Sequence, residues 1–111
     1  MSELKYDHIL RADALAGFCD DISTAPTIAF DTEFVSEDSY RPELCLIQVA
    51  AGGRLAVIDP LAIGNVDCFW ELVAHPGHRT VVHAGREEFR FCRHAIQRRP
   101  AGWFDTQLAA A

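Results

Sequence analysis

The chain has 111 residues, of which 50% are hydrophobic and 23% charged, so it has the size of one domain and is too apolar for a disordered segment. Its formal net charge is −6 at pH 7, and no apolar stretch is long enough to span a bilayer. No signal peptide is visible at the N-terminus, so we expect a cytoplasmic protein without a membrane partner.

The first half of the chain predicts one helix and an antiparallel sheet. Apolar residues recur at helical spacing over residues 12–24 and predict an amphipathic helix there. Three segments rich in β-branched and aromatic residues predict strands at residues 27–34, 44–50 and 55–58. Gly52 and Gly53 separate the last two segments and are typical of a tight hairpin, so the three strands should form a meander.

The second half alternates helices with strands. Helices are expected at residues 68–74 and 86–97, and strands at 80–83 and 103–104. Asp105 is expected to cap a last helix that begins at Thr106. The whole pattern predicts a mixed α/β fold. Because the chain stops within two turns of that helix, we expect it to be a fragment.

Cysteines and tryptophans fit a hydrophobic core. Cys19, Cys45, Cys68 and Cys92 lie in apolar surroundings, and none of their spacings is that of a zinc-ligand pair. We expect four reduced, buried thiols. Trp70 and Trp103 are also expected to pack in the core rather than to stack on bases.

The segment around residues 28–34 carries the sharpest chemical pattern. On a strand, Asp31 and Glu33 share one face, and Ile28, Phe30, Thr32 and Phe34 share the other. Two neighbouring carboxylates repel each other, and a hard divalent cation such as Mg²⁺ or Mn²⁺ would relieve that repulsion. A sheet with one wet face, on which the two acids are simply exposed, explains the same pattern. The segment alone leaves both interpretations open.

A second pattern follows the expected strand at residues 80–83. His83 ends the strand, a small-residue turn follows, and Glu87 and Glu88 fall in the first turn of the next helix, where acids are favoured by the helix dipole alone. Five of the ten basic residues lie between residues 86 and 99, and all five are arginines. They fit phosphate contacts, and they fit a solvated helix face equally well.

Five segments, taken in this order and at these spacings, resemble the 3′–5′ exonuclease domain of the ribonuclease D family: residues 27–34, 43–48, 55–61, 83–89 and 104–107. That family belongs to the DEDD exonucleases, which hold two divalent metal ions with four carboxylates. The resemblance implies a ribonuclease H-like mixed sheet, with an antiparallel meander followed by alternating helices and strands. It also implies that residues 1–111 are the N-terminal part of such a domain.

By this resemblance, Asp31, Glu33 and Glu88 are the catalytic and metal-binding residues, and two Mg²⁺ or Mn²⁺ ions are the cofactors. The family has Asp where this chain has Glu88, and Glu87 does not match the family spacing. The third motif, a Tyr or His followed by the fourth Asp, is expected beyond residue 111. We therefore expect the 111-residue chain to be an incomplete catalyst.

The resemblance implies that the partner is the 3′ end of an RNA such as a tRNA precursor. The candidate RNA-binding residues are Thr32, Phe34, Gln48, His83, Arg86 and Arg90. From the residues alone, Gln48 also fits a hydrogen-bonded sheet position and His83 a structural hydrogen-bonding group.

Two other functions fit the sequence. One is a catalytically silent RNA-binding or interaction module with the same fold, and the other is a different metal-dependent phosphohydrolase. We also expect self-association, because without the later helices of the family the apolar face of Ile28, Phe30, Ile47 and Val49 should be only partly covered.

Overall fold

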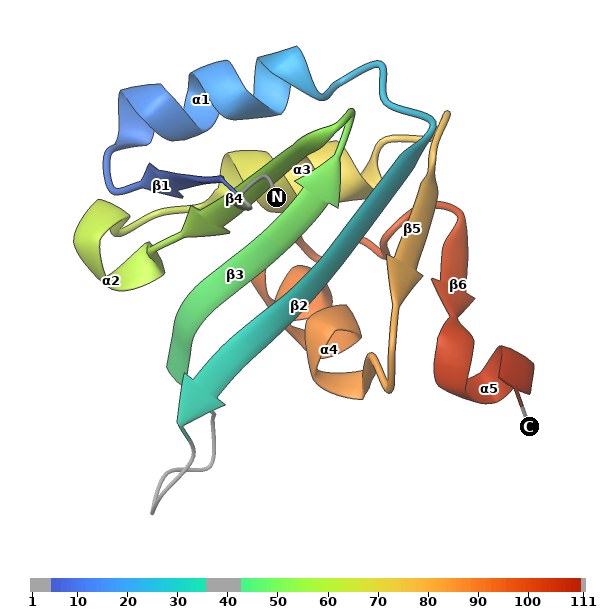
Figure 1. Ribbon diagram of the computed structural model, residues 1–111. Coiled ribbons are helices and arrows are strands. Elements are labelled where there is room, and N and C mark those ends of the chain that lie inside the picture. The colour runs from blue at the N-terminus through green and yellow to red at the C-terminus, as the bar shows by residue number, and fades with distance from the viewer. Residues whose placement is uncertain (1–4, 36–42, 111) are drawn as a thin grey trace.

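A six-stranded mixed sheet forms the centre of the computed structural model, which describes residues 5–35 and 43–110 (Figure 1). The strands are β1 (Tyr6–Ile9), β2 (Thr27–Val35), β3 (Glu43–Ala51), β4 (Arg54–Ile58), β5 (Arg79–Val82) and β6 (Trp103–Asp105). Their order across the sheet is β1-β4-β3-β2-β5-β6. The helices are α1 (Ala12–Asp21), α2 (Pro60–Ile63), α3 (Asp67–Ala74), α4 (Arg86–Ile96) and α5 (Thr106–Ala110).

The predicted meander is confirmed. β3 pairs antiparallel with both β2 and β4. Between β3 and β4 the chain turns at Gly52 and Gly53, whose φ angles of 58° and 76° are left-handed and favour glycine at both positions. β5 then joins the other edge of β2 in parallel, and β6 joins β5 in parallel, so the sheet is mixed as predicted.

Two short elements were missed by the sequence analysis, and one helix is shorter than predicted. β1 pairs parallel with β4, and α2 begins at Pro60 after Asp59, whose carboxylate accepts the Ala62 N–H at 3.1 Å. α1 ends at Asp21 rather than at residue 24, because Ile22 already leaves the helical conformation. None of the described helices combines the length and apolarity needed to cross a membrane.

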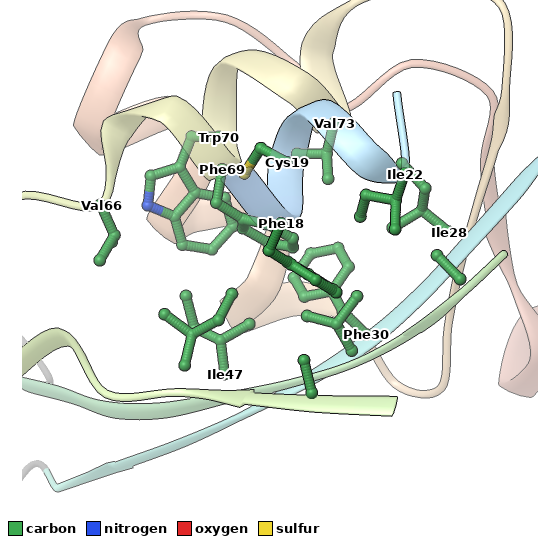
Figure 2. Close-up of a cluster of buried hydrophobic side chains, with 14 of the residues drawn as sticks. Phe18, Cys19, Ile22, Ile28, Phe30, Ile47, Val66, Phe69, Trp70 and Val73 are labelled. Carbon is green, nitrogen blue, oxygen red and sulfur yellow. The ribbon is translucent and has the colours of Figure 1, made fainter. Parts of the chain in front are cut away.

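The hydrophobic core lies between one face of the sheet and the helices α1, α3 and α4; Figure 1 shows α3 and α4 behind the strands and α1 above them. We call this the covered face and the opposite one the open face. The ring of Phe30 lies 5.4 Å from that of Phe69 and 5.8 Å from that of Trp70, and the three side chains gather in Figure 2. Trp70 is therefore in the core as predicted, while Trp103 is half-buried with its ring 5.3 Å from that of Phe89.

The premise of the predicted self-association is wrong. The four side chains expected to be partly uncovered are at most 4% exposed and belong to the buried core cluster: Ile28, Phe30, Ile47 and Val49. Self-association therefore stays a prediction without this support.

The cysteine prediction holds only in part. All four thiols are free as predicted, and Cys19 and Cys92 are buried. Cys45 is half-buried, and Cys68 is exposed because it is not on the face of α3 that packs in the core, which is formed by Phe69, Trp70, Val73 and Ala74. Burial raises the pKa of the Cys19 thiol to about 12 and that of the Cys92 thiol to about 11. These two buried thiols are thus neutral side chains of the core.

Candidate active site

The alternation predicted for β2 places the two acids on the open face of the sheet. Asp31 and Glu33 are exposed, whereas Thr32 between them points to the covered face and is 6% exposed. The pairing with β3 shifts register after Glu33, so a bulge ends the regular alternation there. Phe34 follows the bulge, is 37% exposed, and lies with its ring 5.7 Å from that of Phe91 in α4.

Glu88 approaches β2 from the first turn of α4. Its side chain is 4% exposed, and its carboxylate accepts a hydrogen bond from the hydroxyl of Thr32. Thr32 was predicted to contact RNA, but its side chain is instead buried against Glu88. Burial is the largest influence on the Glu88 carboxyl and raises its pKa. The charge of Asp31 also raises this pKa, whereas the Thr32 hydrogen bond opposes the rise.

The three predicted ligands are thus near one another in the fold but do not form a closed set. Within residues 5–35 and 43–110, no three His, Cys, Asp or Glu side chains gather closely enough to hold one ion. Across the same described residues, no basic side chain forms an ion pair with Asp31, Glu33 or Glu88. Their carboxylate oxygens suit Mg²⁺ or Mn²⁺, and the unfavourable charge of buried Glu88 beside Asp31 is one that a divalent cation would relieve.

Several predicted site residues line a shallow hollow of about 430 Å³ on the open face. Asp31 lies opposite Gln48 in the β2–β3 register, and both line this hollow together with His83 and Thr106. The ring Nδ1 of His83 lies 2.7 Å from the Thr106 hydroxyl oxygen, and that hydroxyl donates to the Val82 carbonyl at 3.2 Å. The structural role considered for His83 is therefore supported, while its ring still lies beside the hollow.

Asp105 caps α5 as predicted and also binds the turn before α4. The cap is present, since the Gln107 N–H donates to Asp105 Oδ1 at 3.0 Å. The same carboxylate also accepts the backbone N–H groups of Ala84 at 2.9 Å and Gly85 at 2.8 Å. These hydrogen bonds, that of Gly85 first, lower the pKa of Asp105. Sequence reasoning missed this link, because it joins residues 20 positions apart through the pairing of β5 with β6.

The arginines of α4 are not at this hollow. Arg86 and Arg90 line a larger groove of about 1300 Å³ between α4 and the β6–α5 segment. Arg90 also pairs with Glu87 at 3.4 Å. Arg98 pairs with Glu71 at 2.9 Å, and Arg99 lies over the ring of Phe89. Arg98 thus has its partner outside both the hollow and the groove, whereas Phe89, the partner of Arg99, lines the groove.

Comparison with known proteins gives a consistent result. A family model described as 3′–5′ exonuclease matches residues 6–111. The chain is 37% identical to ribonuclease D of Escherichia coli, covering 97% of this chain and 29% of that protein. It is 44% identical to ribonuclease D of Zymomonas mobilis, covering 93% of this chain and 27% of that protein. The chain therefore spans less than a third of the length of these relatives.

Solved structures show the same relationship in three dimensions. The crystal structure of the Escherichia coli enzyme matches with a TM-score of 0.88 at 37% identity over 97% of this chain and 29% of that one. Trypanosoma brucei RNase D in complex with RNA U12 matches with a TM-score of 0.75 at 21% identity over 94% of this chain and 39% of that one, a likeness of fold. The predicted ribonuclease H-like mixed sheet and the predicted resemblance are confirmed.

Proposed function

The chain belongs to the 3′–5′ exonuclease family, and from that premise we propose that it is the N-terminal part of a two-metal-dependent exoribonuclease of ribonuclease D type. Its reaction is the hydrolysis of the terminal phosphodiester at the 3′ end of an RNA. The observation that carries the proposal is the grouping of Asp31 and Glu33 on the open face with buried Glu88 behind Thr32. Among the described residues neither Asp31 nor Glu33 has an ion-pair partner, and a bound divalent cation would relieve their mutual repulsion.

Each residue has a distinct task in this mechanism. Asp31 and Glu33 offer carboxylate oxygens from the open face, and Glu88 offers a third carboxylate that the Thr32 hydroxyl holds in place. Divalent ions bound there would lower the pKa of an attacking water and neutralise the charge on the leaving 3′ oxygen. Gln48 and His83 line the hollow beside Asp31, where the Gln48 amide can donate a hydrogen bond to the terminal nucleotide. Because the Thr106 hydroxyl donates to the Val82 carbonyl, His83 donates to it through Nδ1–H and can accept a hydrogen bond through Nε2.

The proposed substrate is a structured RNA such as a tRNA precursor. The Escherichia coli relative is described as an exoribonuclease involved in structured RNA processing, which supports this class. Phe34, which is 37% exposed, is proposed to contact a base of the RNA, and Arg86 and Arg90 its phosphates. We place the fourth carboxylate of the site outside residues 1–111, so the 111-residue chain alone should not trim a 3′-labelled RNA.

The alternative is a catalytically silent RNA-binding module. It is favoured by Glu88, which carries one methylene more than the Asp of the family, and by the lack of a closed three-ligand set within the described residues. A module of this kind would bind RNA without Mg²⁺ or Mn²⁺ and would not depend on Asp31 or Glu33.

Metal-dependent thermal stability separates the two functions. A ligand that binds only the folded chain stabilises it by about 2.7 kcal/mol at a concentration 100 times its Kd. We expect Mn²⁺ to raise the Tm of the wild-type chain and to leave that of Asp31→Asn/Glu33→Gln unchanged. The control is Asp20→Asn/Glu71→Gln, which removes two exposed carboxylates of α1 and α3 and should keep the Mn²⁺ response. An equal response in all three chains would remove the metal site and favour the silent module.

A further inference from the structure

The turn between β5 and α4, at Ala84 and Gly85, leads directly into the first turn of α4, where Glu88 lies. Ala84 has a φ of 53°, a left-handed conformation that a non-glycine residue adopts only when its surroundings enforce it. Gly85 is the N-cap of α4 and, without a side chain, gives the helix no side-chain cap. A Cβ at Gly85 would collide with Val82 and Trp103, so the turn is held in a tight space.

Asp105 supplies the support that the turn lacks. Its two carboxylate oxygens separately accept the N–H groups of Ala84 and Gly85, the two residues that immediately precede α4. The neighbouring hydroxyl of Thr106 holds the same turn from the strand side, through the Val82 carbonyl and the His83 ring. Asp105 at the end of β6 and Thr106 after it thus hold the end of β5 and the start of α4 through hydrogen bonds.

Resting on the proposed function, we propose that Asp105 is a positioning residue for Glu88, the ligand that α4 contributes. Glu88 lies three residues beyond Gly85, within the first helical turn, so a turn fixed at Gly85 also fixes the direction in which the Glu88 carboxylate leaves the helix. In that direction the carboxylate accepts the hydrogen bond of the Thr32 hydroxyl on β2. Outer residues that orient a metal ligand typically contribute 10- to 100-fold to metal affinity.

The test replaces Asp105 by Asn in the 111-residue chain. An amide keeps one acceptor and turns the other into a donor, so one of the two turn N–H groups loses its partner. The matched control is Asp59→Asn, since Asp59 caps α2 beside β4, away from the β5–β6 side of the sheet. It makes the same chemical change without touching the α4 turn, and the amide oxygen keeps the one acceptor that the α2 cap uses. Two readouts are measured below the unfolding transition: the NMR resonance of the Thr32 methyl group, with Glu88→Ala as the reference for a lost contact, and the affinity for Mn²⁺.

We expect Asp105→Asn to move the Thr32 methyl resonance toward its Glu88→Ala position and to weaken Mn²⁺ binding about 10-fold or more. Asp59→Asn should change neither readout. Adding Ala84→Gly to Asp105→Asn should restore part of both, because glycine adopts the left-handed turn without the carboxylate. If Asp105→Asn does not fold, Thr106→Val removes only the neighbouring hydroxyl and should give a smaller shift in the same direction.

The outcomes separate this inference from the proposed function. A Thr32 methyl resonance that stays at its wild-type position in Asp105→Asn overturns the inference, whether or not Mn²⁺ binds. A resonance that moves with unchanged Mn²⁺ affinity also overturns it, because Glu88 would then not act as a ligand through Asp105. If the resonance moves and the wild-type chain binds no Mn²⁺, Asp105 still positions Glu88, and the proposed function fails.

Discussion

Ile28, Phe30 and Thr32 of β2 face the helices and are at most 6% exposed, whereas Asp31 and Glu33 of the same strand face solvent. The two faces therefore constrain neighbouring residues differently. On the covered face, the packing of a side chain determines how much it stabilises the fold, whereas on the open face a carboxylate can bind a ligand. Along β2, a residue that stabilises the core is therefore followed directly by one whose side chain is free to bind a ligand.

The two faces meet at one pair of residues. The Thr32 side chain lies on the covered face, yet its hydroxyl donates a hydrogen bond to the carboxylate of Glu88. This carboxylate is one of the proposed metal ligands. If the separation of the two faces is real, substitutions on the covered face should cost stability, those on the open face should cost metal binding, and this pair alone should affect both.

The largest expected effect lies on the covered face. Phe30→Ala should lower the free energy of unfolding by about 3–5 kcal/mol, because it empties space between the rings of Phe69 and Trp70. Urea denaturation at 25 °C measures the change, with Asp31→Ala as the neighbouring control on the open face. A loss below about 1 kcal/mol for Phe30→Ala would mean that the covered face is not the close-packed core described.

An intermediate effect is expected at the shared pair. Thr32→Val is nearly isosteric and should cost about 1–3 kcal/mol at pH 8, because it leaves a buried Glu88 oxygen without its donor. The Thr32 bond holds the pKa of Glu88 down against burial, so its loss raises that pKa further. A carboxyl whose folded pKa is raised contributes stability that is present below its unfolded pKa and lost as the pH rises through the folded value. The cost of Thr32→Val should therefore be smaller at pH 4 than at pH 8.

A second substitution shows whether Glu88 is the titrating group. In a Glu88→Gln background the amide cannot ionise, so the cost of Thr32→Val should be the same at pH 4 and pH 8. If the pH dependence survives in Glu88→Gln, another group causes it, and the link between the two faces does not run through this pair.

Sequence patterns predicted what is local, and the structure adds what is brought together from afar. The alternation of Asp31 and Glu33 with Phe30, and the turn at Gly52 and Gly53, depend on neighbouring residues and could be predicted. β1 could not, since Tyr6–Ile9 is short and mostly exposed and becomes a strand only by pairing with β4. α2 had a local signal that was missed, because Asp59 followed by Pro60 is typical of a helix start.

In the candidate site, too, local features could be predicted from the sequence and contacts between distant residues could not. The resemblance to the exonuclease family implies Glu88 as a ligand, but nothing in the sequence places its carboxylate against Thr32, because 56 residues separate the pair. For the same reason Thr32 was predicted to face RNA. Asp105 was predicted to cap α5. Its hydrogen bonds to the backbone N–H groups of Ala84 and Gly85 depend on the pairing of β5 with β6. A sequence pattern predicts which residues are polar, while the fold decides which of them meet.

The smallest expected effect on stability lies on the open face of β2. Asp31→Asn should change the free energy of unfolding by no more than about 0.5 kcal/mol, because the exposed side chain has no core contact to lose and an amide of equal size relieves its repulsion of Glu33 and Glu88. The same substitution should weaken Mn²⁺ binding, since a neutral amide oxygen is a poorer ligand than a carboxylate. Urea denaturation and Mn²⁺ titration of one purified variant measure both, with Phe30→Leu as the reverse case: less stable, with Mn²⁺ affinity kept. If Asp31→Asn lowers the free energy of unfolding as much as Phe30→Leu does, the open face also stabilises the fold. The separation of stability and metal binding between the two faces of β2 would then be contradicted.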